Sequence, residues 1–138
     1  MIRIFLFLSM VLVMASCSAQ LNKKVEVSFP NGKPQIVRYY DKHNQCVKET
    51  EYYETGQVKL EGPLKDGKRE GKWRAYLRDG RPWSIDDFKD GELDGSSTVY
   101  WENGNLRWEG YYKAGKHCGH WKWYDEQGIL LREDNYGD

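Results

Sequence analysis

The 138-residue sequence lacks a surplus of either charge, because 21 Lys and Arg residues balance 21 Asp and Glu residues. A protein that binds the phosphate backbone of nucleic acid needs a basic surface, so the balance gives no electrostatic support for that partner. Charge itself is plentiful, since 30% of the residues are charged and the mean hydropathy is -0.85. We therefore expect no nucleic-acid binding.

The sequence also lacks the short motifs of common enzymes, namely a nucleophile elbow, a P-loop, a dinucleotide-binding fingerprint or H-E-x-x-H. Its adjacent acids, Asp86-Asp87 and Asp125-Glu126, do not resemble a glycosidase pair, whose carboxyl groups face each other across a cleft. We therefore predict a protein that has no enzymatic activity and needs no cofactor.

Histidine and cysteine are scarce, with three residues of each. His117, Cys118 and His120 lie close together, which raises the question of a metal site. A zinc site needs a fourth ligand and converging side chains, whereas His117 and Cys118 are neighbours that diverge in an extended chain. We expect these residues to lie in a surface turn and to bind no metal.

One long apolar run is present, from Ile4 to Met14, and it follows Arg3. It is shorter than the roughly 20 residues of a transmembrane helix. A basic residue, a short apolar run and small residues are typical of a secretory signal peptide. We expect this peptide over residues 1–16.

Residues 14–17, Met-Ala-Ser-Cys, resemble a bacterial lipobox. The resemblance implies cleavage before Cys17 and acylation of that cysteine, which would anchor the chain in a membrane. The alternative is an ordinary signal peptide cleaved near Ala19. With lipidation, residues 17–24 would be a short tether on the periplasmic side of the cell envelope, and Ser18 favours the outer membrane.

Glycine is abundant, and it recurs with a 24-residue period, the interval from Gly56 to Gly80. Three series keep this period: Gly56, Gly80, Gly104 and Gly128; Gly67, Gly91 and Gly115; and Gly71, Gly95 and Gly119. A tyrosine series keeps it too: Tyr52, Tyr76, Tyr100 and Tyr124. A fixed period of this length indicates a repeat protein whose units stack on their neighbours.

Each unit contains two turn signals of the Asn-Gly or Asp-Gly type, which accept the backbone angles of a hairpin tip. The segments between them are rich in Tyr, Trp, Val and Thr, as strands are. We therefore predict an all-β fold over residues 25–138. It would be an elongated antiparallel meander of β-hairpin repeats, about nine or ten strands in a single curved sheet.

Strand alternation predicts one face that is more apolar and one that mixes tyrosine with charges. Most aromatic side chains are expected to form the core and the cross-strand contacts. The alternative is that some stay exposed and bind a partner. The candidate binding residues are Trp101, Trp108, Trp121, Trp123, Tyr76, Tyr100 and Tyr124.

Residues 81–95 depart from the repeat, since Pro82 cannot donate to a strand ladder and Asp86 stands where other units have Gly62 and Gly110. We expect a bend or bulge there, and the alternative is a functional notch.

Cys46 and Cys118 lie three units apart. Six strand spacings in an open sheet separate such residues by about 29 Å. A disulfide needs Cα atoms within about 7 Å, so an open sheet would keep both thiols free.

Residues 109–128, E-G-Y-Y-K-A-G-K-x-x-G-x-W-K-W-Y-x-x-x-G, resemble the second variant of the MORN repeat. Units of this type cover about residues 50–136. The resemblance implies β-hairpins stacked into an elongated, curved sheet that acts as a scaffold. Bacterial chains of this variant are commonly labelled as YwqK-like antitoxin components of toxin–antitoxin systems.

Taken with the signal peptide, these features predict a non-enzymatic, membrane-anchored repeat scaffold. Its partner would be another protein, a toxin or a protein of the cell envelope, and it would meet the membrane through Cys17. The alternative is a module that binds envelope glycans or lipids with exposed aromatic side chains.

Overall fold

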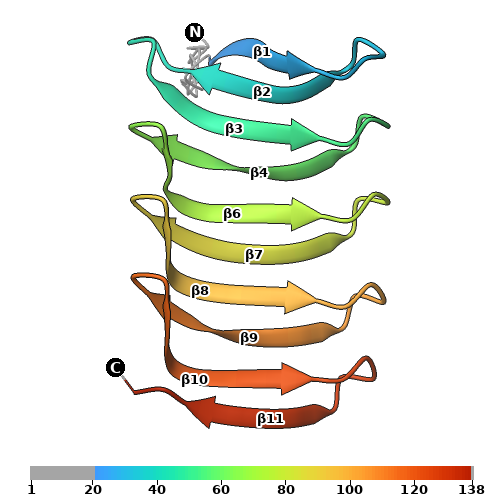
Figure 1. Cartoon of the computed structure of the whole chain (residues 1–138), viewed down its shortest axis with the longest axis vertical. Coiled ribbons are helices and arrows are strands. Elements are labelled where there is room, and N and C mark those ends of the chain that lie inside the picture. Colours follow the sequence, from blue (N-terminus) through green and yellow to red (C-terminus); the bar gives the residue numbers. More distant parts are fainter. Residues whose placement is uncertain (1–20, 138) are drawn as a thin grey trace, which may run out of the picture.

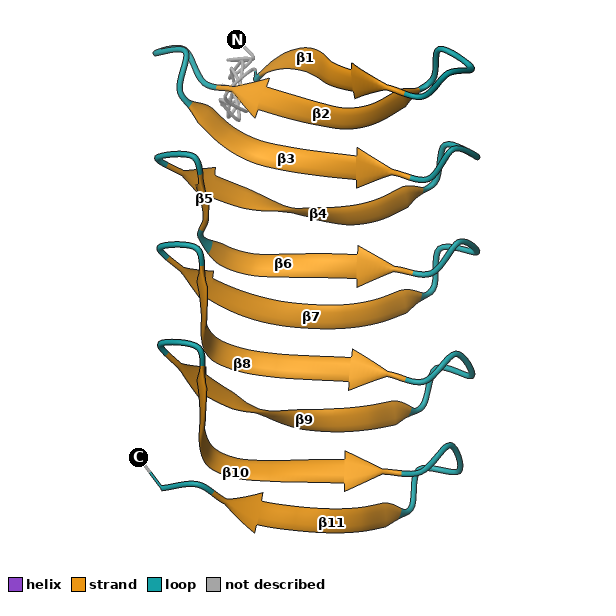
Figure 2. Ribbon diagram, viewed as in Figure 1, coloured by secondary structure: helices purple, strands orange, loops and turns teal. Residues whose placement is uncertain are grey.

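The computed structural model describes residues 21–137, and the expected signal peptide and Cys17 lie outside them. Eleven strands joined by short turns make up the described chain (Figure 2). They are β1 (Asn22–Ser28), β2 (Pro34–Tyr40), β3 (Cys46–Tyr52), β4 (Val58–Lys65), β5 (Lys68–Arg69), β6 (Gly71–Tyr76), β7 (Pro82–Lys89), β8 (Glu92–Tyr100), β9 (Leu106–Lys113), β10 (Lys116–Tyr124) and β11 (Leu130–Asn135).

The strands form one antiparallel sheet whose order follows the chain, and the two-residue β5 pairs with β4 beside this path. Figure 1 shows successive hairpins stacked along the long axis, with turns on both sides. The sheet is open, with β1 and β11 at its edges. The predicted all-β meander is therefore confirmed, and the short β5 brings the number of strands to eleven.

Strands one 24-residue period apart occupy equivalent places in the sheet. Asn22, at the start of β1, lies one period before Cys46, at the start of β3. The described chain thus consists of five hairpin units. The first strand lies partly inside residues 17–24, the segment expected to be a tether. The repeat therefore begins at Asn22, slightly closer to the N-terminus than the predicted boundary at residue 25.

The turns after β4, β7 and β9 have two central residues that both adopt positive φ. This is the type I′ geometry, whose twist matches that of the paired strands. In the first two turns the leading residue is an aspartate, Asp66 (φ 51) or Asp90 (φ 52), and in the third it is Ala114 (φ 47). Alanine has no side-chain polar group to stabilise this conformation, so Ala114 is a strained position.

We expect Ala114→Asn to raise the free energy of unfolding by about 0.5–1 kcal/mol, because asparagine tolerates positive φ better than alanine does. Urea denaturation followed by tryptophan fluorescence would measure the change. Ala114→Val is the matched control and should destabilise the chain, because a β-branched residue adopts positive φ at still greater cost. Equal midpoints for both variants would contradict this account of the turn.

Strand β10 bends where Gly119 adopts a φ of +60, and its pairing with β9 breaks between Cys118 and Lys122. An equivalent break lies between Asp86 and Phe88 in the pairing of β7 with β8. The bulge expected within residues 81–95 is therefore confirmed. The bend recurs in the repeat, since Gly95 and Gly71, one and two periods before Gly119, also adopt positive φ.

The core of the sheet is built on two tryptophans, Trp73 on β6 and Trp121 on β10, each 2% exposed. Each ring lies flat against a glycine of the neighbouring strand. A Cβ added at Gly62 would lie 2.4 Å from the ring of Trp73, and one at Gly110 would lie 2.2 Å from that of Trp121. The two glycines are therefore required by close packing rather than by a turn.

Both indoles also donate a hydrogen bond that fixes the ring. Nε1 of Trp73 donates to the carbonyl oxygen of Pro63 at 2.9 Å, and Nε1 of Trp121 donates to that of Tyr111 at 3.0 Å. The two acceptors lie two 24-residue repeats apart in the sequence, so the same contact holds both tryptophans. Buried indole N–H groups need such partners.

The outer side of each core ring is covered by the residue that precedes the bend. The guanidinium of Arg69 lies 4.2 Å from the ring centre of Trp73, and the imidazole of His117 lies 3.9 Å from that of Trp121. His117, Cys118 and His120 thus lie on strand β10, so the expectation of a turn was wrong, whereas His117 and His120 are exposed as expected. The bend directs His117 onto the core, where it has a packing role.

Three neighbouring strand pairs, β4–β6, β7–β8 and β9–β10, hold this place in the core. The β7–β8 pair, which we call the middle unit, has a polar pair in place of the glycine–tryptophan pair. Ser97 occupies the position of the tryptophan and is 3% exposed, and Asp86 occupies the position of the glycine. The hydroxyl of Ser97 donates to Asp86 at 2.6 Å, and that of Ser84 donates to the other carboxylate oxygen at 2.8 Å. A hydrogen-bonded cluster therefore fills the space that an indole fills in the other two units.

Cys46 on β3 and Cys118 on β10 are both free thiols. Six steps across the sheet separate their strands, as the open meander predicted.

Candidate functional site

The candidate aromatic residues lie on two faces of the sheet. Val99 on β8 pairs with Trp108 on β9, which pairs with Trp123 on β10, so these side chains share a face with the core tryptophans. We call this the tryptophan face. The hydroxyls of Tyr76 and Tyr124 bond to glutamates on the opposite face, so the tyrosines and the tryptophans do not form one site.

Trp121 cannot serve as an exposed stacking platform, because its ring is buried between Gly110 and His117. The prediction of a binding role was wrong for this residue. Its place is in the core, where it also packs against Tyr112 at 4.9 Å between ring centres.

Cations cover the other candidate tryptophans. The guanidinium of Arg107 lies 4.3 Å from the ring centre of Trp101 and 4.9 Å from that of Trp108, and that of Arg132 lies 4.6 Å from that of Trp123. A guanidinium over an indole is attracted by the negative face of the ring. Arg107 therefore stacks on two indoles at once, and Arg132 stacks on a third.

Trp101 has a second structural contact, because its Nε1 donates to the carbonyl oxygen of Tyr124 at 3.0 Å. The hydroxyl of Tyr53 donates in the same way to the carbonyl of Tyr76 at 2.8 Å. These bonds join the turn of one unit to the hairpin of the next, so the aromatic residues hold the hairpins in register.

On the opposite face, the hydroxyl of Tyr76 donates to Glu61 at 3.2 Å and that of Tyr124 donates to Glu109 at 3.0 Å. Tyr100 is the equivalent residue of the middle unit, and Ile85 stands in the place of its glutamate. Burial, followed by the neighbouring Glu61, raises the pKa of Tyr76. The tyrosines of this face thus pair with glutamates of the neighbouring strand, except in the middle unit.

Lys48 joins this network, because its Nζ lies 2.7 Å from Glu61. The hydrogen bond from Lys48 is the main cause that holds the pKa of Glu61 below its ordinary value of 4.5. A carboxylate with a lowered pKa stabilises the fold above its pKa in the unfolded chain, and this contribution disappears as the pH falls through its pKa in the folded protein.

We therefore expect Lys48→Met to lower stability at pH 7 by less than about 1 kcal/mol, because the pair is half exposed and screened by solvent. At pH 3 the wild type and the variant should be closer in stability than at pH 7, because the contribution of the ion pair declines as the pH falls toward the lowered pKa of Glu61. Urea midpoints at the two pH values would measure this. Glu61→Gln, which cannot ionise, should also flatten the pH dependence, and an unchanged gap at pH 3 would contradict the assignment.

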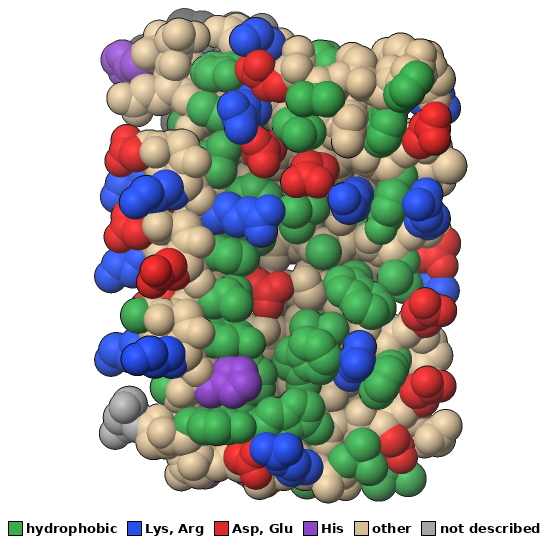
Figure 3. All heavy atoms as spheres, viewed as in Figure 1, with side chains coloured by type: hydrophobic (Ala, Val, Ile, Leu, Met, Phe, Trp, Pro, Cys, Tyr) green, Lys and Arg blue, Asp and Glu red, His purple; other side chains and the backbone are tan. Residues whose placement is uncertain are grey.

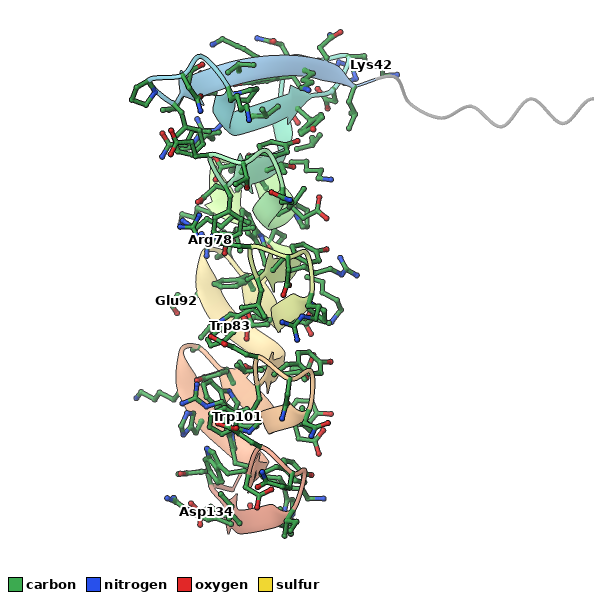
Figure 4. The ribbon with its side chains drawn as sticks, turned by 90° about the vertical axis from the view of Figure 1, so that its right-hand side faces the viewer. Lys42, Arg78, Trp83, Glu92, Trp101 and Asp134 are labelled. Carbon is green, nitrogen blue, oxygen red and sulfur yellow. The ribbon has the colours of Figure 1, made fainter. Side chains whose placement is uncertain are left out.

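Sequence analysis did not identify Trp83 on β7 as a candidate, although its side chain lines hollows on the tryptophan face. Two adjoining hollows share Trp83 and Glu102 as lining residues, and each has a volume of about 410 Å³. Figure 4 shows Trp83 and Trp101 one below the other on the same side of the sheet. Trp83 occupies the position that Lys59 and Arg107 hold in the neighbouring units, which is the signal that could have identified it.

The first hollow is mainly apolar, with Leu60, Ala75 and Leu77 beside Trp83. The second contains Trp101, Arg107 and the carboxylates of Glu102 and Glu126. Hydrophobic side chains gather in this part of the face and continue across the hairpins (Figure 3). We call the two hollows together the Trp83 groove.

Within residues 21–137, no group of three or more His, Cys, Asp or Glu side chains is placed to hold a metal ion. In the same residues, no helix has the length and apolar character needed to cross a membrane.

An open meander of regularly repeated hairpins, built on a recurring glycine–tryptophan contact, defines a β-hairpin repeat scaffold. The sequence model of the MORN repeat variant matches residues 45–66, 93–114 and 118–138. Three segments of the chain are therefore similar to the MORN repeat variant. A search of curated proteins found no match to this chain.

Proposed function

We propose that this repeat scaffold is anchored in a membrane of the cell envelope and binds another protein with its tryptophan face. The observation that carries the proposal is the Trp83 groove, an aromatic hollow on a face whose other tryptophans are packed or covered. Tryptophan, tyrosine and arginine are the residues most often responsible for the binding energy of protein interfaces. All three line or border this groove.

The anchor rests on the sequence alone. Acylation of Cys17 would fix the chain by its N-terminal end, close to β1, and leave the stacked hairpins to extend away from the bilayer. The antitoxin role implied by the family resemblance would then require an exported toxin, because the scaffold would face away from the cytoplasm. An envelope protein fits the same location without this requirement.

Site-specific photocrosslinking in intact cells tests the proposal. A photoreactive aromatic residue at position 83, which keeps a ring in the groove, should give a protein adduct, whereas the same residue in place of Arg74, which is exposed on the opposite face, should not. A glycan-binding module would instead give no protein adduct at position 83, and its tryptophan fluorescence would change on addition of cell-wall glycan. That outcome, or equal adducts at both positions, would overturn the proposal.

A Cys17→Ala variant of the same photoreactive chain tests the anchor. It should leave the membrane fraction and lose the adduct at position 83. Retention of the variant in the membrane fraction would contradict acylation at Cys17.

A further inference from the structure

All six tryptophans lie within the described residues, and five of them have a cation or an imidazole over the ring. Arginine covers four of these rings, with guanidinium-to-centre distances between 4.2 and 4.9 Å. His117 covers the fifth, Trp121. Trp83 is the exception, because no cation or ring of residues 21–137 stacks on it.

Trp83 is uncovered because its position in the repeat holds an arginine in the next unit. Arg107, one unit after Trp83, supplies the guanidinium that covers Trp101 and Trp108. At position 83 the chain has an indole in place of that arginine. Position 83 therefore carries an additional ring and no guanidinium, and the hollow beside Trp83 remains open.

Some charged side chains around this hollow have a partner within the chain and others do not. Arg107 is stacked on two indoles, and Lys59 pairs with Glu51 at 3.6 Å. The carboxylates of Glu102 and Glu126 are exposed, and neither forms an ion pair with any residue of the described chain. The guanidinium of Arg81 donates to the main-chain carbonyl of Glu102 and leaves its carboxylate without an ion pair. A cation that enters the groove would therefore meet an open indole face and two carboxylates that form no ion pair.

We propose that the Trp83 groove binds an arginine side chain of a protein partner, whose guanidinium lies over Trp83 with Glu102 and Glu126 as its counter-charges. This inference rests on the proposed protein-binding function and specifies the chemistry of the partner. Arginine fits better than lysine, because a planar guanidinium stacks on an aromatic face, as this chain shows at its own tryptophans. The apolar side chains of Leu60, Ala75 and Leu77 would contact residues that flank the arginine.

The test uses the full-length chain in detergent micelles and two capped peptides, acetyl-Gly-Arg-Gly-Arg-Gly-amide and its citrulline counterpart. Citrulline keeps the shape of arginine and lacks its charge. NMR spectra of the ¹⁵N-labelled protein report the six indole N–H groups separately, and Trp83→Phe assigns the signal of Trp83. The arginine peptide should shift this signal saturably, and the citrulline peptide should bind about fivefold or more weakly.

Variants separate this site from general attraction. Trp83→Ala, followed through the indole of Trp101, should lower the affinity about tenfold, because the stacking platform is lost. Glu102→Gln should lower it severalfold and weaken its dependence on salt. Tyr111→Ala is the matched control, because Tyr111 is a 56% exposed aromatic outside the groove, and it should leave the affinity unchanged.

Equal binding of the arginine and citrulline peptides, or equal losses in the Trp83→Ala and Tyr111→Ala variants, would overturn the inference. If the photoreactive residue at position 83 still captured a protein and the arginine peptide did not compete, protein binding would stand and the arginine assignment would fall. If the adduct at position 83 and the binding of the arginine peptide were both absent, the proposals of protein binding and of arginine recognition would both be wrong.

Discussion

Gly110→Ala is expected to lower the free energy of unfolding by about 3 kcal/mol, because the added methyl group overpacks a full core. Its Cβ would lie 2.2 Å from the ring of Trp121, nearer than two non-bonded carbon atoms can approach. The indole cannot move away easily, because its Nε1 is bound to the carbonyl of Tyr111 and its outer face is covered by His117. The ring or the strand must therefore leave its place.

Urea denaturation monitored by tryptophan fluorescence would measure this loss. Gly62→Ala should behave in the same way, since its Cβ would lie 2.4 Å from the ring of Trp73. The control is a double-mutant cycle with Trp121→Val, in which the smaller side chain leaves room for the methyl group. If Gly110→Ala cost as much in the Trp121→Val background as in the wild type, the contact with the indole would not be the cause.

The period of the sequence predicts the fold well, for a physical reason. A two-residue turn that needs positive φ permits few residue types, so Asp66-Gly67 and Asp90-Gly91 mark hairpin tips directly. Equivalent turns one period apart fix both the strand length and the order of the sheet. Strand alternation then separates the tryptophans from the tyrosine column without any knowledge of tertiary structure.

The exposure of each aromatic residue could not be predicted from its own strand. Trp121 and Trp123 lie on the same face of β10, yet Trp121 is buried and Trp123 is half-buried beneath an arginine. The difference comes from the residue across the strand pair: Gly110 lets the indole of Trp121 lie flat on the sheet, and Trp108 opposes Trp123. Burial therefore depends on strand register as well as on residue type.

The roles of His117 and Trp83 were missed for a related reason. His117 is equivalent to Arg69, and both cover a core indole. The sequence shows a variable position there, because a guanidinium and an imidazole can perform the same packing role. Trp83 takes a position that is cationic in the units on either side, and it became recognisable as a site once the cation–indole stacks of the other units were known.

Ser97→Trp is expected to destabilise the chain by about 3 kcal/mol, although tryptophan is the normal residue at this position in two other units. The glycine that accommodates those indoles is replaced here by Asp86. A tryptophan at position 97 would meet this carboxylate and remove the hydroxyl that donates to it at 2.6 Å. The variant would thus combine overpacking with a half-buried carboxylate that has lost a donor.

The addition of Asp86→Gly should restore most of that stability, because the pair would then reproduce the contact of Gly62 with Trp73. Asp86→Gly alone should also destabilise the chain, since Ser84 and Ser97 would lose their acceptor. The expected result is therefore two damaging single substitutions and a double variant near the wild type, measured as a coupling energy of more than about 2 kcal/mol in urea denaturation. Additive losses would show that the middle unit cannot adopt the packing of its neighbours. The glycine–tryptophan pair would then need the covering side chain of Arg69 or His117, whose place Leu93 takes in the middle unit.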